Sequence, residues 1–142
     1  MNKLLVPVDG SENALRAVRH AVALAKQIGS ASIHLVNVHE EPLLYGEIAV
    51  YVPREKMEAL QRQHSQAILA RAEDIVGESG IAHTKEILVG HIAQTIAQHA
   101  KQLGCDAIVM GTRGMTSIGN LVMGSVATKV VHLTDLPVTL VK

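Results

Sequence analysis

Aromatic residues are scarce in this sequence. They make up 1% of the 142 residues, with no Trp, no Phe and two tyrosines, Tyr45 and Tyr51. The core must therefore be aliphatic, and the chain lacks the aromatic platforms on which flavins or single-stranded bases stack. This composition argues against a flavoprotein and against a protein that holds single strands by stacking.

Cysteine and net charge are also nearly absent. Cys105 is the one cysteine, and 13 Lys and Arg residues balance 13 Asp and Glu residues. A single cysteine excludes an intrachain disulfide framework. Because the formal net charge is zero, no strong field draws the chain to nucleic acid or to an anionic membrane, and we expect neither as a partner.

Long apolar runs are missing too. No stretch reaches the roughly 20 apolar residues of a membrane span. Asp9 interrupts the apolar run from Leu4 to Val8 before the hydrophobic region of a signal peptide can form. We therefore expect one soluble, cytoplasmic domain that covers residues 1–142.

The sequence does contain strands that alternate with helices. Five short runs rich in β-branched residues are separated by segments of helical periodicity. The runs are Lys3 to Val8, Ser32 to Val38, Lys85 to Val89, Ala107 to Gly111 and Leu136 to Val141. This alternation predicts an α/β fold, an open five-stranded parallel sheet with right-handed crossovers and helices on both faces.

Four helices are expected between these runs. They extend from Ser11 to Ile28, from Pro53 to Gly77 or Gly80, from Ile92 to Leu103, and over Val126 to Val131. The apolar stripe of the second helix comprises Met57, Leu60, His64, Ile68, Ala72 and Ile75. A helix face of this kind points to the core, so we expect a partly buried His64 rather than a catalytic base.

A glycine-rich segment follows the fourth run, where open parallel sheets bind their ligands. It reads Gly111-Thr-Arg-Gly114, then nine residues, then Gly124-Ser125 at the start of the last helix. Such spacing can form a cradle of amide N–H groups for phosphate, and the helix N-terminus adds roughly 0.3–1 kcal/mol for an anion. Arg113 would add a charge-assisted contact. The alternative is that these glycines only form a tight turn and permit close packing.

Two familiar phosphate-binding motifs are excluded. Gly119 to Ser125 has the glycine spacing of a P-loop, but no Lys precedes Ser125. No G-x-G-x-x-G follows the first strand, where Pro7-Val-Asp-Gly-Ser11 stands instead. The chain is therefore expected to be neither a P-loop NTPase nor a Rossmann dehydrogenase.

The glycine pattern has a more specific parallel. Its arrangement G-x2-G-x9-G-S, preceded by Asp106-Ala-Ile-Val-Met-Gly, resembles the ATP-binding branch of the universal stress protein family. The opening Leu5-Val-Pro-Val-Asp-Gly-Ser and the closing Leu136-Pro-Val resemble the same family, so the resemblance spans the chain. It implies an adenine-nucleotide-hydrolase-like fold, for which we expect the strand order 3-2-1-4-5.

The resemblance also implies an ATP site between the ends of the first, second and fourth strands. Asp9 and the neighbouring backbone would contact the nucleoside, the backbone of Val38 would face adenine, and the glycine segment would surround the phosphates. The implied contacts are Pro7, Val8, Asp9, Val38, Met110, Gly111, Arg113, Gly114, Gly124, Ser125 and Val126.

Mg²⁺ is expected to accompany the triphosphate. No carboxylate lies between Arg113 and Thr134, so the ion would bind mainly phosphate and water. Asp9 either makes a water-mediated contact to it or caps the turn before the first helix.

A protein metal site and a catalytic nucleophile are not expected. His91 and His99 are separated by about 12 Å of helical rise, too far to share an ion. His34 and His39 show no Cys or carboxylate partner at ligand spacing, so the histidines are interpreted as surface or helix-face residues. Cys105 has no visible His and Asp partners.

Three functions remain. The first is an ATP-binding regulatory or stress-response factor with an unknown protein partner and at most slow hydrolysis, because no base, nucleophile or arginine finger is identifiable. The second is an interaction module of the same fold that binds no nucleotide. The third is an ATP-using transferase, whose H-x-G-H or S-G-G-x-D-S motif is absent at Asp9-Gly-Ser11.

A homodimer is expected as well. In the strand order 3-2-1-4-5 the last strand lies at a sheet edge, and it is short, apolar and almost uncharged. Such an edge invites pairing with a second copy. The irregular segment from His39 to Val52 would either close over the nucleotide or lie at the dimer surface.

Overall fold

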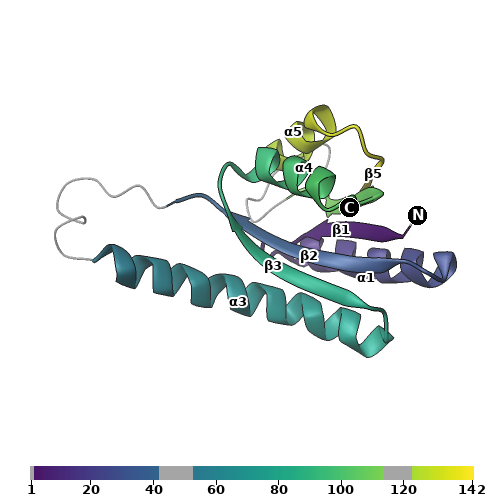
Figure 1. Cartoon of the computed structure of the whole chain (residues 1–142), viewed down its shortest axis with the longest axis horizontal. Coiled ribbons are helices and arrows are strands. Elements are labelled where there is room, and N and C mark those ends of the chain that lie inside the picture. The colour runs from purple at the N-terminus through teal and green to yellow at the C-terminus, as the bar shows by residue number, and fades with distance from the viewer. Residues whose placement is uncertain (1, 42–52, 114–122) are drawn as a thin grey trace.

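The computed structural model describes residues 2–41, 53–113 and 123–142, and within these ranges the chain forms five strands and four helices (Figure 1). In chain order they are β1 (Lys3–Pro7), α1 (Glu12–Ile28), β2 (Ser32–His39), α3 (Arg54–Ser79), β3 (His83–Val89), α4 (Ile92–Gln102), β4 (Ala107–Gly111), α5 (Ser125–Leu133) and β5 (Val138–Val141). The expected runs and helical segments are confirmed, with limits that differ by a few residues.

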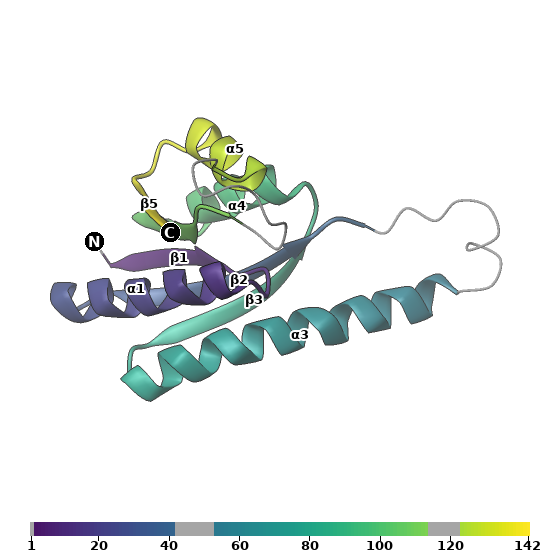
Figure 2. The ribbon, with the colours of Figure 1, turned by 180° about the vertical axis from the view of Figure 1, so that it is seen from behind.

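The strands form one parallel sheet in the order β3-β2-β1-β4-β5, as expected. α1 and α3 cover one face, and α4 and α5 cover the other (Figures 1 and 2). Because side chains alternate along a strand, neighbouring residues of β1 enter different cores: Leu4 faces α1 and α3, and Leu5 faces α4 and α5. β1 is therefore apolar on both sides of the sheet.

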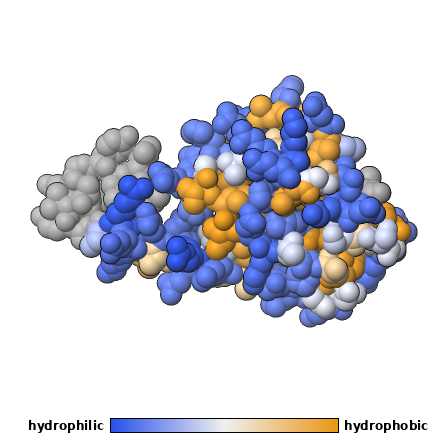
Figure 3. Space-filling view, viewed as in Figure 1, coloured by the Kyte–Doolittle hydropathy of each residue, from blue (hydrophilic) through white to orange (hydrophobic). Residues whose placement is uncertain are grey.

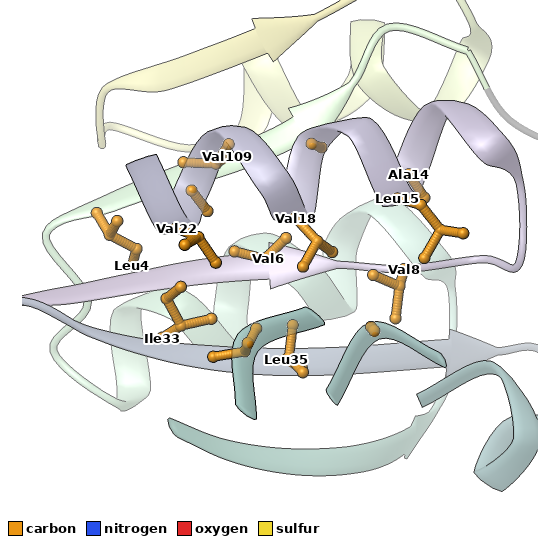
Figure 4. Close-up of a cluster of buried hydrophobic side chains, with 14 of the residues drawn as sticks. Leu4, Val6, Val8, Ala14, Leu15, Val18, Val22, Ile33, Leu35 and Val109 are labelled. Carbon is orange, nitrogen blue, oxygen red and sulfur yellow. The ribbon is translucent and has the colours of Figure 1, made fainter. Parts of the chain in front are cut away.

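The core under α1 is aliphatic throughout. Figure 4 shows Leu4 and Val6 of β1, with Val8 just after the strand, beneath Val18 and Val22 of α1. The sequence predicts α1 well because its caps are local: the Ser11 hydroxyl accepts the Ala14 N–H at 3.0 Å, and Gly29 ends the helix at a φ of 87°.

The expected burial along α3 is wrong for its first half. Ile68 and Ala72 are buried, whereas Leu60 is 53% exposed and His64 is exposed. The first turns of α3 extend beyond the carboxyl ends of the strands (Figures 1 and 2), so no sheet lies beneath them. Their surface is mostly hydrophilic on the side seen in Figure 3. The helical period alone could not reveal where the covering layer stops.

Two other sequence-based expectations concern the tyrosine-containing segment and membrane spans. Tyr45 and Tyr51 lie outside the described residues, so both roles for their segment stay predictions. In the described part of the chain, none of the helices combines the length and apolarity needed to cross a membrane.

Candidate functional site

A cavity of about 330 Å³ opens at the carboxyl ends of β1, β2 and β4. Its size falls within the range of small-molecule sites, and its position is where open parallel sheets bind ligands. The described residues around it are Pro7, Val8, Asp9, Ala14, Val38, Ile92, Ile96, Met110, Gly111, Thr112, Arg113, Gly124, Ser125, Val126 and Ala127.

One side of this cavity is apolar. Val38 comes from β2, Met110 from β4, and Ile92 and Ile96 from consecutive turns of α4. Val8 is fixed by β2, because its N–H donates to the Val36 carbonyl and its own carbonyl accepts the Asn37 amide, both at 2.8 Å. This wall suits a flat, weakly polar group such as a nucleobase.

Helix N-termini also contribute to the lining of the cavity. Ala14, Ile92 and Ser125 each lie in the first turn of a helix and line the cavity. The N-cap residues of α4 and α5, His91 and Gly124, make no side-chain capping hydrogen bond. Unpaired N–H groups and the helix dipole make such ends favourable for anions, each by roughly 0.3–1 kcal/mol.

The two halves of the glycine pattern meet in this lining. The Gly124 N–H donates to the Thr112 carbonyl at 2.6 Å, and Gly124 precedes the first turn of α5. Arg113 also lines the cavity. The geometry therefore combines a cation, a helix start and backbone amides in one place.

Glycine is required at position 111 because the Asn13 side chain lies close to its backbone. The Asn13 side chain accepts the Arg113 N–H at 2.8 Å and donates to the Val141 carbonyl at 2.9 Å. A Cβ on Gly111 would overlap the Asn13 side-chain oxygen. Asn13 thus ties α1 to the ends of β4 and β5, and it holds the backbone at Arg113 in position.

Asp9 has the turn-capping contacts that we had considered as one alternative. One of its carboxylate oxygens accepts the Ser11 N–H at 2.9 Å and the Ser11 hydroxyl at 2.6 Å. Gly10 adopts a φ of 90° between them, which favours glycine. Asp9 also lines the cavity and is the one carboxylate in its described lining. A capping role and a role toward a ligand are therefore compatible.

The structure brings the sequence-predicted residues together from separate segments. Of the implied contacts, Gly114 lies outside the described residues. The others all line the cavity: Pro7, Val8, Asp9, Val38, Met110, Gly111, Arg113, Gly124, Ser125 and Val126. Ala14, Ile92, Ile96, Thr112 and Ala127 were missed. Their position in the sequence could have revealed them, because most of them lie in the first turn of a helix that follows the end of a strand.

Asn13 was missed for a different reason. It is a polar residue on the buried face of an amphipathic helix, with 5% of its surface exposed. Such a residue needs partners, but the sequence does not show that these are Arg113 and Val141. Only the folded chain supplies them.

The expectation for the histidines is wrong in part. His34 is 5% exposed and its ring contacts that of His99, whose Nε2 lies 3.0 Å from a carboxylate oxygen of Glu86. These residues belong to β2, α4 and β3, so chain spacing hides their proximity. For Cys105 the structure supports an inert role, because burial raises the pKa of its thiol.

The sequence and the fold are similar to those of known proteins. The model of the Universal stress protein family matches residues 1–142. The chain belongs to this family. The universal stress protein YxiE of Bacillus subtilis is 31% identical over 147 residues, which cover 99% of both chains.

Solved structures of universal stress proteins share the fold. UspA of Lactobacillus plantarum superposes with a TM-score of 0.85 at 25% identity, covering 99% of this chain and 97% of that one. A universal stress protein of Archaeoglobus fulgidus in complex with dAMP gives a TM-score of 0.67 at 25% identity, covering 100% and 98%. At least one relative therefore binds an adenine nucleotide.

Proposed function

We propose that this universal stress protein binds an adenine nucleotide, ATP with Mg²⁺, in the cavity at the carboxyl ends of β1, β2 and β4. It would act in the cytoplasm as a nucleotide-dependent regulatory or stress-response factor. The observation that carries the proposal is the convergence of the implied contacts, which come from distant segments and line one cavity. The dAMP complex of the Archaeoglobus relative supports the same ligand class.

The nucleobase would occupy the apolar wall. Val38 and Ile96 offer aliphatic contact to a ring face, and the backbone of Val38 at the end of β2 would hydrogen-bond to its edge. Because the described lining contains no Trp, Phe or Tyr, this contact relies there on burial rather than on aromatic stacking. The expected consequence is recognition of the base mainly by shape.

The phosphates would lie against the glycine segment. Arg113, the start of α5 and the backbone around Gly111 surround this side of the cavity. Each favours an anion by charge or by N–H donation. Mg²⁺ would be held chiefly by phosphate and water, since Asp9 is the one carboxylate in the described lining and its capping oxygen is already engaged.

Hydrolysis would be slow at most. The described lining contains no His, Cys or Lys, and its single carboxylate hydrogen-bonds to Ser11. Efficient phosphoryl transfer needs a group that orients the attacking nucleophile as well as charge stabilisation. The site therefore supports binding better than turnover, and the transferase alternative has no residue in the described lining that favours it.

A homodimer through β5 completes the proposal. β5 ends the sheet order and pairs with β4 on one side, and among the described residues no strand pairs with its other side. Light scattering at micromolar concentration is expected to give the mass of a dimer. A monomer would remove this part of the proposal and leave the nucleotide site untouched.

Thermal unfolding with and without Mg-ATP tests the nucleotide site. Ligand at 100 times its Kd adds about 2.7 kcal/mol, which raises the Tm of a domain of this size by roughly 5–11 °C. We expect this rise in the wild type and its loss in Gly124→Val, where the new side chain fills the cradle.

A matched control is Gly77→Val in α3, because a Cβ at Gly77 meets nothing within 4 Å. It should retain the full Tm rise. If the wild type shows no rise with ATP, ADP or AMP, nucleotide binding is excluded and the interaction module without nucleotide becomes the function to pursue through partner capture.

A further inference from the structure

Three side chains with metal-ligating atoms meet beneath α4, outside the cavity. His34 comes from β2, Glu86 from β3 and His99 from α4, and one ligand atom of each lies within 4.8 Å of the other two. None of the three lines the cavity. We propose that His34, Glu86 and His99 form a binding site for a divalent transition-metal ion, Zn²⁺.

Two contacts in the cluster are close to the spacing of ligand atoms around a tetrahedral ion. Zn²⁺ binds imidazole nitrogen at about 2.0–2.1 Å, so two ligand atoms on a tetrahedron lie about 3.3–3.4 Å apart. The Nε2 atoms of His34 and His99 are 3.3 Å apart, and the His99 Nε2 is 3.0 Å from Glu86 Oε2. Two imidazoles and one carboxylate are a known zinc ligand set, which leaves a fourth position for water.

The surroundings orient the His34 ring. Its Nδ1 lies 2.5 Å from the Thr84 hydroxyl on the neighbouring strand, so its Nε2 is directed at the other two ligands. Metal-binding histidines are usually held in this way through their second nitrogen. Burial also lowers the pKa of His34, which favours the neutral imidazole that a metal requires.

Access and charge are suitable as well. The side chain of Glu86 is 44% exposed and that of His99 is 12% exposed, so an ion can enter from the edge of the sheet formed by β3. Glu86 supplies one negative charge. The positive charge of Lys3 lowers the pKa of His34, whereas Glu86 raises it. The Lys3 ammonium group donates a hydrogen bond to the Leu103 carbonyl at 3.3 Å.

The same contacts admit a metal-free explanation. A proton on the His99 Nε2 would donate to Glu86 and, more weakly, to the His34 Nε2. The two arrangements differ in what they predict for added metal. A hydrogen-bonded cluster gains nothing from Zn²⁺, whereas a site binds about one ion per chain and ties α4 to β2 and β3.

Calorimetric titration of untagged, metal-free protein with Zn²⁺ alone distinguishes the two. We expect a stoichiometry of about one for the wild type. Glu86→Gln and His99→Gln should each lower the affinity ~10-fold or more, since outer partners alone are worth 10–100-fold. His20→Gln is the matched control, because His20 is an exposed histidine of α1 on the opposite face of the sheet. It should bind like the wild type.

Co²⁺ gives a second readout that does not depend on heat signals. A tetrahedral site is expected to produce an intense visible spectrum in the wild type and in His20→Gln, and to lose it in Glu86→Gln. Thr84→Val, which keeps all three ligands, should weaken binding ~10–100-fold without abolishing the spectrum.

Absence of Zn²⁺ binding by the wild type would overturn the proposal. Equal binding by the wild type and His99→Gln would overturn it too, because the metal would then lie on surface histidines. All titrations are done without nucleotide, so their outcome is independent of whether the cavity binds ATP. Far-UV circular dichroism of each variant checks that it is folded, so that a loss of metal binding is not caused by unfolding.

Discussion

The two faces of the sheet are built differently although they share the same strands. The face under α1 and α3 carries a continuous aliphatic core that includes Leu4, Val18 and Leu35. The face under α4 and α5 carries a smaller apolar core, and at its β3 edge polar side chains such as His34 and Glu86 replace the apolar ones. The cavity also takes part of its wall from α4 and α5. One face therefore supplies most of the apolar packing, while the other carries the three residues of the proposed metal site and part of the cavity wall.

The largest effect is expected from truncating adjacent leucines of β1 that face opposite ways. Leu4 and Leu5 are both fully buried. Leu4→Ala should lower the free energy of unfolding by about 2–5 kcal/mol, because it opens a cavity in the continuous core. Leu5→Ala should fall toward the lower end of that range, since the smaller core beside a cavity relaxes more readily. Urea unfolding measures both, and a greater loss for Leu5→Ala would reverse the comparison.

A smaller effect is expected where α1 meets the binding end of the sheet. Gly111→Ala displaces the Asn13 side chain and so breaks its bonds to Arg113 and Val141. We expect a loss of about 1–3 kcal/mol, the usual cost of leaving buried polar groups unpaired, together with weaker nucleotide binding.

A double-mutant cycle with Asn13→Ala isolates this contact. In that background the space beside Gly111 is free, so Gly111→Ala should cost much less. Equal costs in the two backgrounds would show that Asn13 does not account for the glycine.

A pH effect just below neutral pH is expected from the face under α4. Desolvation lowers the pKa of His34 below its ordinary 6.5, and His99 and Lys3 act in the same direction while Glu86 opposes them. The unfolded chain therefore binds more protons than the folded one as the pH falls below 6.5, and stability declines until the folded-state pKa is passed. Tm measured between pH 7.5 and about 5 should fall in the wild type, and His34→Gln should flatten that part of the curve. An unchanged slope would place the titrating group elsewhere.

The smallest effect is expected from an ion pair on the surface of the aliphatic face. Arg71 of α3 and Glu12 of α1 are 3.2 Å apart, but both side chains are more than half exposed. Solvent and salt screen such pairs, so Arg71→Gln should change stability by less than ~0.5 kcal/mol. A shift of several degrees in Tm would show that this helix pair depends on charge more than on the core beneath it.

The sequence predicts the elements and their order well because the signals are local. Ser11 and Gly29 mark α1 through caps that need only neighbouring residues, and the alternation of runs implies a parallel sheet with two covered faces. The sequence does not predict that His64 is exposed, because the exposure of this residue depends on how far the sheet extends beneath α3.

The sequence by itself determined an aliphatic α/β chain and a glycine pattern after the fourth strand, since composition, period and caps act over a few residues. Only the tertiary structure decided that Asn13 fills the space at Gly111, that first turns from three helices surround one cavity, and that His34, Glu86 and His99 meet. These contacts join residues far apart in the chain, such as His34 and His99, so no local pattern encodes them. Strand register and helix packing bring them together.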